Sequence, residues 1–186
     1  MRIVAGSARS RTILTPPGRD TRPTLDRVRE NLFNILQFRC PQARVLDLFA
    51  GSGALALEAL SRGAASAVLV DSAPPAHQVQ LRNIQALGFT LQAQALLMDW
   101  RKALDALAQS GEAFDLIFLD PPYKLTDLIP VTQGLLGGGL LAPAGLVVVE
   151  HDHQTEPSVC PGLALKDRRR YGIAGISIFH TAPTYG

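Results

Sequence analysis

The sequence predicts an α/β protein built on a doubly wound, mostly parallel seven-stranded sheet, with a C-terminal antiparallel strand pair and a short N-terminal β-hairpin and helix. From Arg44 onward, short apolar runs alternate with helical patterns, which is typical of parallel strands joined by right-handed crossovers. The last two apolar runs are separated only by Gly172, and so short a connection joins antiparallel strands.

Chain length and composition indicate one domain. The 186 residues can bury a sizeable core once, and 47% hydrophobic with 18% charged residues is the composition of a folded protein. We expect residues 1–22 to form an arginine-rich hairpin appendage, 23–40 an entry helix and 44–186 the core.

Each element follows from a local pattern. Glycine and serine within residues 6–10 separate two apolar runs at 2–5 and 11–14, which predicts the hairpin. Leu25, Val28 and Leu32 recur at helical spacing behind Thr24, a residue type that caps helix N-termini. Further strands are predicted at 45–50, 67–71, 91–98, 114–120, 146–150, 164–171 and 173–181, and further helices at 54–62, 75–87, 100–109 and 128–136.

Positive charge is concentrated near the start of the chain. Residues 1–44 hold nine arginines and no lysine against three acidic residues, a net charge of +6 in a chain whose total is +2. Arginine binds phosphate bidentately and stacks on bases, so a polyanionic partner and a merely solvated surface are both open interpretations. The candidate nucleic-acid contacts are Arg9, Arg11, Arg22, Arg27 and Arg29, with Arg168, Arg169 and Arg170 as a second group that could equally be a solvated strand edge.

Membrane, secretory and metal signals are absent from the sequence. Glycine and proline interrupt the longest apolar stretch before it could span a bilayer, and residues 1–10 lack the apolar segment of a secretory signal. Cys40 and Cys160 are isolated, without the spacing of a disulfide framework or a metal site. We therefore expect a cytoplasmic monomer without a metal or a membrane partner.

Three predicted core strands lead into residues suited to binding an adenosine group. In an open α/β sheet, ligands bind at the carboxyl ends of the strands. The first strand leads into a glycine turn, where missing side chains let a ligand approach the backbone. Asp71 ends the second strand at the spacing of a carboxylate that binds ribose hydroxyls, and Asp99 ends the third, placed to accept a hydrogen bond from an adenine amino group. The predicted cofactor-binding residues are Asp47, Phe49, Gly51, Ser52, Gly53, Asp71, Asp99 and Trp100.

The glycine turn alone does not identify the cofactor, because it also fits the loose dinucleotide pattern of nicotinamide enzymes. Asp47 favours S-adenosylmethionine. A carboxylate close to a bound pyrophosphate would be repelled, whereas one near the cationic methionine part of S-adenosylmethionine would be attracted.

Asp120-Pro121-Pro122-Tyr123 closes the fourth core strand and predicts the catalytic site. The prolines fix the backbone and disfavour a helix, so the loop is stiff. An exocyclic amino nitrogen of a base is a poor nucleophile, because its lone pair is delocalised into the ring. If Asp120 and the Pro121 carbonyl each accept one of its hydrogens, they stabilise the tetrahedral nitrogen of the transition state. Tyr123 would stack on the extruded base, and the proton would pass to Asp120 or to water.

These residues resemble class I methyltransferases of the amino-methylating type and, within them, the bacterial 16S ribosomal RNA guanine-N2 methyltransferases. The resemblance covers nearly the whole chain and rests on residues 2–6, 22–24, 26–30, 49–55, 58–63, 120–123 and 174–175. Many nucleic-acid methyltransferases share the tetrapeptide, whereas the arginine-rich entry helix is more specific to this family. One departure is Ser10, which lies between Arg9 and Arg11 where the family tends to have glycine.

The resemblance implies a Rossmann-like fold in which the glycine turn, Asp71 and Asp99 hold S-adenosylmethionine. Residues 120–123 would hold the guanine amino group, and the N-terminal arginines would bind RNA. The implied substrate is 16S ribosomal RNA, in the small subunit or in its assembly intermediate.

Other functions remain open from the sequence. Methylation of adenine N6 in DNA or of a protein glutamine uses the same kind of acceptor loop. An NAD-dependent oxidoreductase would leave residues 120–123 and the arginine excess unexplained, and an RNA-binding module without activity would not need acidic residues at three strand ends.

Overall fold

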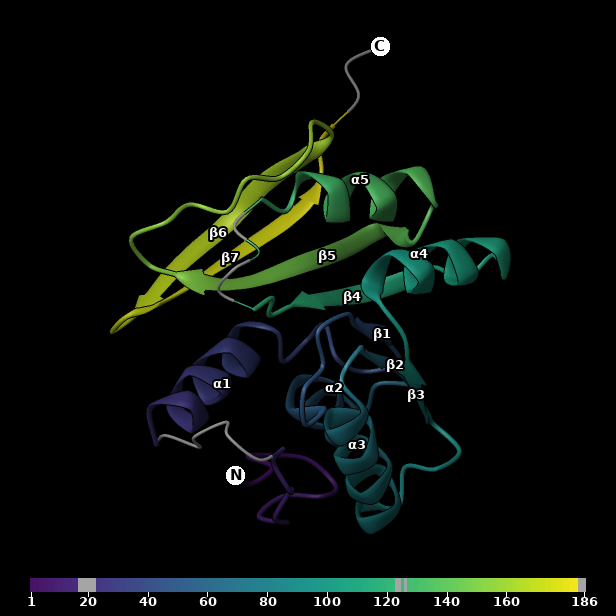
Figure 1. Cartoon of the computed structure of the whole chain (residues 1–186). Coiled ribbons are helices and arrows are strands. Elements are labelled where there is room, and N and C mark those ends of the chain that lie inside the picture. Colours follow the sequence, from purple (N-terminus) through teal and green to yellow (C-terminus); the bar gives the residue numbers. More distant parts are fainter. Residues whose placement is uncertain (17–22, 123–124, 126, 184–186) are drawn as a thin grey trace.

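A seven-stranded sheet runs through the molecule in the order β3-β2-β1-β4-β5-β7-β6 (Figure 1). The computed structural model describes residues 1–16, 23–122, 125 and 127–183, so Arg22 and Tyr123 of the predicted site lie outside the described residues. Strands β1 to β5 are parallel, and β7 is antiparallel to both of its neighbours. The strands are β1 (Arg44–Asp47), β2 (Ser66–Asp71), β3 (Ala93–Leu97), β4 (Phe114–Leu119), β5 (Leu141–Asp152), β6 (Leu163–Tyr171) and β7 (Ala174–Thr181).

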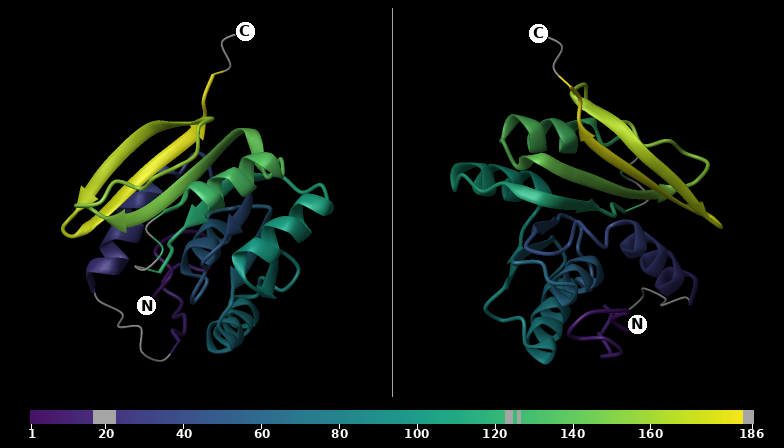
Figure 2. Two further views of the ribbon diagram at one scale, coloured as in Figure 1. Left: turned by 45° about the horizontal axis from the view of Figure 1, so that its top comes forward. Right: turned by 180° about the vertical axis from the view of Figure 1, so that it is seen from behind.

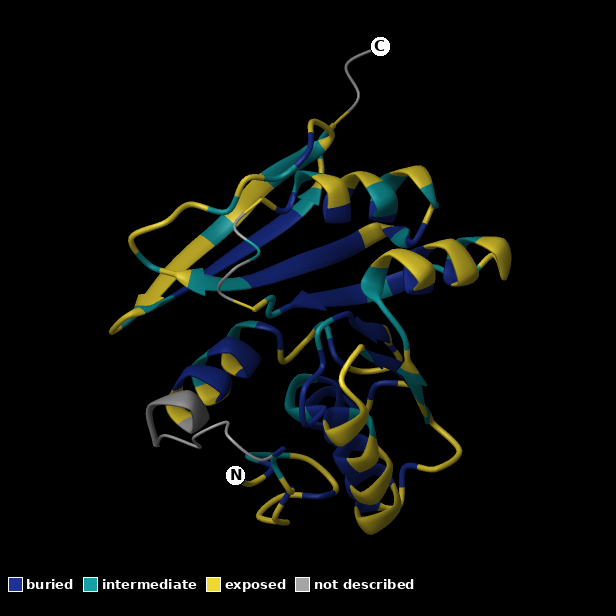
Figure 3. Cartoon of the chain, in the orientation of Figure 1, coloured by how far each residue is buried: buried dark blue, intermediate teal, exposed yellow. Residues whose placement is uncertain are grey.

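Helices cover both faces of the sheet. Helices α1, α2 and α3 lie on one side, and α4 and α5 lie on the other (Figures 1 and 2). The central strands are therefore buried on both faces, which explains their unbroken apolar sequences, whereas β6 is largely exposed (Figure 3). The helices are α1 (Pro23–Ile35), α2 (Ala54–Ser61), α3 (Pro74–Leu87), α4 (Trp100–Gln109) and α5 (Ile129–Gly137).

The predicted fold class is confirmed for the sheet and its helices, with differences at some strand ends. Strand β5 is longer than predicted and begins at Leu141, because it accommodates Pro143 and Gly145 in an irregularity instead of stopping there. Phe114 pairs with Leu141, whereas Leu116 pairs with Leu146, so the register of β5 shifts between these points. Strand β1 is shorter than predicted and ends at Asp47, which leaves residues 48–53 free to form the glycine turn.

The predicted N-terminal hairpin does not form as two strands. Its segments share an isolated antiparallel bridge between Arg2 and Thr12, flanked by hydrogen bonds from the N–H of Ile3 to the Arg11 carbonyl and from the N–H of Ile13 to the Met1 carbonyl, both at 3.0 Å. The backbone N–H groups of Val4 and Ala5 instead donate to the carboxylate of Glu58 at 2.8 and 3.0 Å. The first segment is therefore held both by its short pairing with the second segment and by Glu58 of α2.

Helix α1 begins at the predicted boundary, residue 23, but ends at Ile35, short of the predicted residue 40. Pro23 is its first residue, so Thr24 lies inside the helix and the prediction that it is the N-cap was wrong. Proline is well tolerated at this position, since the first N–H of a helix has no partner within the helix. Among the described residues, no helix has both the length and the apolar character needed to cross a bilayer.

Candidate active site

The glycine turn after β1 is joined to the end of β2 by a hydrogen bond. The N–H of Gly51 donates to Oδ2 of Asp71 at 2.9 Å, and the N–H of Ala73 donates to Oδ1 at 2.9 Å. Each oxygen of Asp71 thus accepts one backbone N–H and keeps a lone pair for a further donor such as a hydroxyl. The carboxylate is partly exposed, so a ligand can reach it.

Asp47 and Gly53 fix the path of the chain from β1 into α2. Oδ2 of the buried Asp47 accepts a hydrogen bond from the N–H of Ala56 in the first turn of α2, at 3.3 Å. Gly53 has φ +81°, and a Cβ there would lie 2.5 Å from Cδ2 of Leu69. The left-handed backbone conformation therefore favours glycine at this position, and a side chain here would also displace the end of Leu69 on β2.

Two buried polar residues of α3 support the turn, and the sequence analysis missed them. Nε2 of Gln80 donates to the Gly51 carbonyl at 3.1 Å, and Nδ2 of Asn83 donates to the Ser52 carbonyl at 3.0 Å. Both side chains are almost fully buried. They occupy positions on the buried face of α3 that would ordinarily be apolar. Polar residues at these positions of the helical pattern were the sequence signal that could have identified them.

Asp99 lies at the same sheet edge and caps α4. Its Oδ1 accepts a hydrogen bond from the N–H of Arg101 at 2.9 Å, and the Arg101 guanidinium lies 3.5 Å from the carboxylate. The guanidinium also lies over the Trp100 ring, 4.3 Å from its centroid. Asp99 is therefore partly engaged by its own helix and remains partly exposed beyond the carboxyl end of β3. Of the other predicted cofactor residues, Ser52 is buried, and Phe49 and Trp100 are partly buried.

The catalytic loop leaves β4 beside the end of β5. Leu119 is in register with Val149, so Asp120 and Glu150 follow at neighbouring positions of the two strands. Alternation along the strands places both residues on the sheet face covered by α1 and α2, which is also the face of Asp47. Burial raises the pKa of Glu150 to about 8, with a further contribution from the negative charge of Asp120. The Pro122 carbonyl accepts a hydrogen bond from the N–H of Leu125 at 2.8 Å.

The predicted RNA-binding arginines differ in exposure. Arg9, Arg11 and Arg27 are exposed, but Arg11 donates to the carbonyls of Ala86 and Leu87 at the end of α3. The exposed arginines at the end of β6 are Arg168, Arg169 and Arg170.

Arg29 does not lie on the surface, contrary to its predicted role as an RNA contact. Its side chain is only 4% exposed, and its Nε lies 3.8 Å from the fully buried Glu58. It also donates to the backbone carbonyl of Arg2. Helical position explains this burial, because Arg29 shares the inward-facing stripe of α1 with Leu32 and Phe33, three and four residues later.

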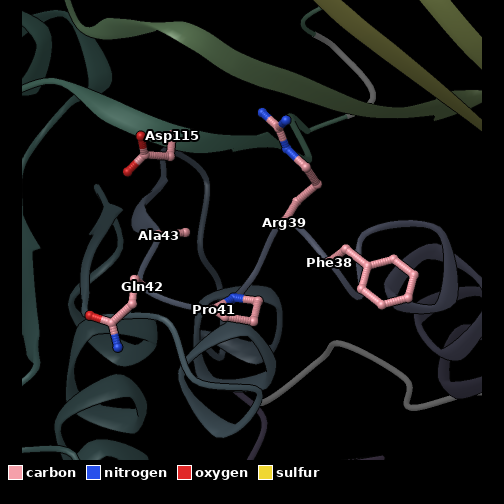
Figure 4. Close-up of a pocket in the computed structure, with 6 residues that line it drawn as sticks. All are labelled: Phe38, Arg39, Pro41, Gln42, Ala43 and Asp115. Atoms are coloured by element: carbon pink, nitrogen blue, oxygen red, sulfur yellow. The ribbon is translucent and has the colours of Figure 1, made fainter.

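A hollow of about 250 Å³ lies away from the predicted site (Figure 4). Its lining includes the exposed Phe38, together with Arg39, Ala43 and Asp115. Ala43 precedes β1 and Asp115 is the second residue of β4, so the hollow lies at the amino ends of the strands. It is thus at the sheet edge opposite the glycine turn and the catalytic loop. Within the described part of the chain, no group of three histidine, cysteine, aspartate or glutamate residues is arranged to hold a metal ion.

Comparison with protein families identifies the chain. The family model described as "Conserved hypothetical protein 95" matches residues 1–180. The chain belongs to this family. Its relatives include "Ribosomal RNA small subunit methyltransferase D" of Escherichia coli K12, 40% identical over 152 residues that cover 82% of this chain and 75% of the relative. Another is "Putative rRNA methyltransferase YlbH" of Bacillus subtilis 168, 38% identical over 180 residues that cover 96% of this chain and 98% of the relative.

Solved structures share the fold of this family member. A structure from Escherichia coli titled "Putative methyltransferase yhhF" matches with a TM-score of 0.85 and 32% identity, over 99% of both chains. SMU.776, a methyltransferase-fold protein solved in complex with SAH, matches with a TM-score of 0.71 at 17% identity, over 86% of this chain and 50% of that chain. At that identity the second likeness concerns the fold alone, and the chain has the α/β fold of methyltransferases.

Proposed function

We propose that this family member is an S-adenosylmethionine-dependent methyltransferase that methylates the exocyclic N2 of a guanine in 16S ribosomal RNA. One observation carries the proposal. The stiff Asp120-Pro121-Pro122 loop lies at the same sheet edge as the glycine turn, Asp71 and Asp99, so a base acceptor site and an adenosine site adjoin each other.

The residues at the strand ends fit S-adenosylmethionine by their chemistry. Asp71 has acceptor capacity for ribose hydroxyls beyond its two backbone hydrogen bonds. Asp99 can accept from an adenine amino group, and the negative charge of Asp47 favours a cationic ligand over a pyrophosphate. The bound cofactor supplies an electrophilic methyl group on a sulfonium centre.

The catalytic loop prepares the nucleophile. The Asp120 carboxylate and the Pro121 carbonyl accept the two hydrogens of the guanine amino group, which draws the nitrogen lone pair out of conjugation. Because these acceptors are fixed by the sheet and by the prolines, they need little reorganisation when charge develops. After methyl transfer, Asp120 or water takes the proton from the cationic amine. Tyr123 is proposed as the stacking platform for the base.

RNA binding is assigned to exposed arginines at both ends of the chain. Arg9, Arg11 and Arg27 are the N-terminal contacts, with Arg22 as a further candidate, and Arg168 to Arg170 form the C-terminal group. Arg29 is reassigned to holding Glu58, since a guanidinium that is 4% exposed has little surface for a phosphate. The names of the relatives support ribosomal RNA as the partner.

A methyl-transfer assay with radiolabelled S-adenosylmethionine tests this proposal and its alternatives. Naked 16S ribosomal RNA, isolated small subunits, DNA and protein are offered in parallel, and the methylated nucleoside is identified after digestion. Methylguanine in RNA is the expected product. Methyladenine in DNA or methylglutamine in protein would reassign the substrate, and binding of NAD in preference to S-adenosylhomocysteine would overturn the reaction type.

A further inference from the structure

A basic hollow of about 260 Å³ lies at the end of the C-terminal strands and is lined by the three C-terminal arginines that the proposed function assigns to RNA. Its lining residues are His151, His153, Arg168, Arg169, Arg170 and Gly175. Strand β5 ends here, β6 ends here and β7 begins here, so the hollow lies at the same sheet edge as the catalytic loop. Three guanidinium groups and two imidazoles thus gather close to where the substrate base is proposed to bind.

The register of the strands brings the lining side chains of the hollow together. Ser177 pairs with Val149 on one side and with Arg168 on the other, so these side chains share a face. The Ser177 hydroxyl lies 2.9 Å from Nε2 of His151 and accepts a hydrogen bond from Nε of Arg168 at 3.3 Å. The second ring nitrogen of His151 lies 2.7 Å from the carbonyl of Asp152. The His151 ring is therefore fixed in place by contacts at both nitrogens.

Gly175 makes room for that ring. A Cβ at this position would overlap the His151 imidazole. Arg170 pairs with Gly175 across β6 and β7, so the missing side chain also leaves space between Arg170 and His151. The hollow exists because glycine is present at this register position.

The three arginines differ in their partners. Arg168 forms an ion pair with the exposed Glu156, and Nε of Arg169 lies 3.0 Å from Oδ2 of Asp167. Exposed pairs of this kind contribute about 0–1 kcal/mol, so a phosphate can compete for these guanidinium groups. Arg170 forms no ion pair with a described residue, and its Nε donates to the Gly172 carbonyl at 3.2 Å. Arg170 consequently offers the most available positive charge of the hollow.

Backbone pairing links the hollow to the catalytic loop. His151 directly follows Glu150, the neighbour of Asp120, and its side chain points to the opposite face of the sheet. The segment that follows His153 returns along the sheet, and Ser158 in it forms a parallel bridge with Asp127. A ligand bound in the hollow is thus held on the same framework as Asp120.

We propose that this hollow binds a backbone phosphodiester of the RNA strand that carries the target base, with Arg170 as its main contact and Arg168, on the same face of β6, as the second donor. This inference rests on the proposed function for the identity of the strand. Arg168 and Arg170 lie two positions apart on β6 and therefore share a face, and two guanidinium groups can donate to the oxygens of one phosphate where a single charge cannot. A phosphate held on the far face of the sheet edge would fix the strand while the base enters the site on the near face.

RNA binding by charge-matched variants tests the hollow. Arg170→Gln is compared with Lys166→Gln, which removes the same charge from the same strand but does not line the hollow. Binding of a 16S-derived RNA hairpin is measured by fluorescence anisotropy between roughly 50 and 200 mM salt, a range over which phosphate contacts respond strongly. Arg170→Gln is expected to lower the slope of log affinity against log salt by about 1, and Lys166→Gln by much less.

A second variant tests the geometry without removing a charge. Gly175→Ala displaces the His151 ring, and it is expected to raise the KM for RNA several-fold while kcat at saturating RNA changes less than twofold. Equal salt slopes for Arg170→Gln and Lys166→Gln, or an unchanged KM in Gly175→Ala, would overturn the phosphate site. The anisotropy titration needs no catalysis, so a wild-type protein that binds this RNA through Arg170 but transfers no methyl group would refute the proposed function and not the hollow.

Discussion

Glu150 lies beside Asp120 at the carboxyl ends of two paired strands, because Leu119 of β4 is in register with Val149 of β5. Burial, and then the negative charge of Asp120, raise the pKa of Glu150 to about 8. Glu150 consequently carries a proton at neutral pH, although it adjoins a residue proposed to act as a hydrogen-bond acceptor. Two ionised carboxylates at this corner would repel each other, and protonation of Glu150 removes that repulsion.

The stability of the protein is expected to fall as the pH rises through this titration. The pKa of Glu150 is 4.5 in its ordinary state and about 8 in the folded protein, so the folded state binds more protons between these values. The contribution of Glu150 is complete below pH 4.5 and is lost as the pH approaches and passes 8. Glu150→Gln mimics the protonated form and is expected to be more stable than wild type by about 1–3 kcal/mol at alkaline pH. Urea unfolding across this range measures the difference, and a gap that does not grow with pH would contradict it.

Loss of the Asp120 carboxylate is expected to abolish methyl transfer while sparing the cofactor site. Asp120→Ala removes one of the two acceptors for the amino group, which corresponds to a loss of about 100-fold or more in kcat. Affinity for S-adenosylhomocysteine, measured by isothermal titration, should stay within about twofold, because Asp120 is not assigned to the adenosine slot. Asp105→Asn on the exposed face of α4 is the control. Normal turnover by Asp120→Ala would refute the mechanism.

Asp71→Asn is expected to weaken cofactor binding. The amide retains one acceptor oxygen but places an NH₂ group where the carboxylate now accepts from Ala73 or Gly51. We expect the Kd for S-adenosylhomocysteine to rise about tenfold or more, because the ribose hydroxyls lose a charged acceptor and the glycine turn is loosened. Titration with S-adenosylhomocysteine measures this, with Asp105→Asn again as the reference. An unchanged affinity would remove Asp71 from the site.

The strand ends were predictable because the glycine turn, Asp71 and Asp99 follow runs whose apolar pattern is unambiguous. The support for that turn was harder to predict. Gln80 and Asn83 make their contacts with carbonyls some 30 residues away in sequence, and only the packing of α3 against the turn shows which groups they meet. A local pattern marks a polar residue on a buried face but does not name its partner.

The N-terminal segment shows the opposite kind of failure. Two short apolar runs around a glycine turn are the ordinary signal of a hairpin, and the prediction followed it. The two runs do pair through one antiparallel bridge, but the next N–H groups, those of Val4 and Ala5, donate to Glu58, more than 50 residues away, so the pairing does not extend into two strands. Arg29 was misassigned for the same reason, because its buried partner is also Glu58.

Arg27 and Arg29 are expected to behave differently although they lie two residues apart in α1. Arg27 is exposed, so Arg27→Ala should weaken RNA binding and lower its salt slope by about 1 without altering stability. Arg29→Ala leaves the buried Glu58 with less compensation and should lower the free energy of unfolding by about 3–5 kcal/mol. Denaturant unfolding and RNA titration of both variants separate the two roles. Equal stability losses would contradict the assignment.

Removal of Glu58 is expected to release the N-terminal segment as well as to destabilise the core. Its fully buried carboxylate accepts from Val4 and Ala5 and from Nε of Arg62 at 2.8 Å, and it lies 3.8 Å from Arg29. Glu58→Ala therefore leaves the Arg29 and Arg62 guanidinium groups without their carboxylate partner, which should lower the free energy of unfolding by about 3–5 kcal/mol. It also leaves two backbone N–H groups without their acceptor. Hydrogen exchange at Val4 and Ala5 should accelerate by far more than exchange in the central strands, whereas Glu30→Ala on the exposed face of α1 should alter neither. Uniform acceleration across the chain would show that Glu58 stabilises the fold globally and does not specifically anchor the arginine-bearing segment.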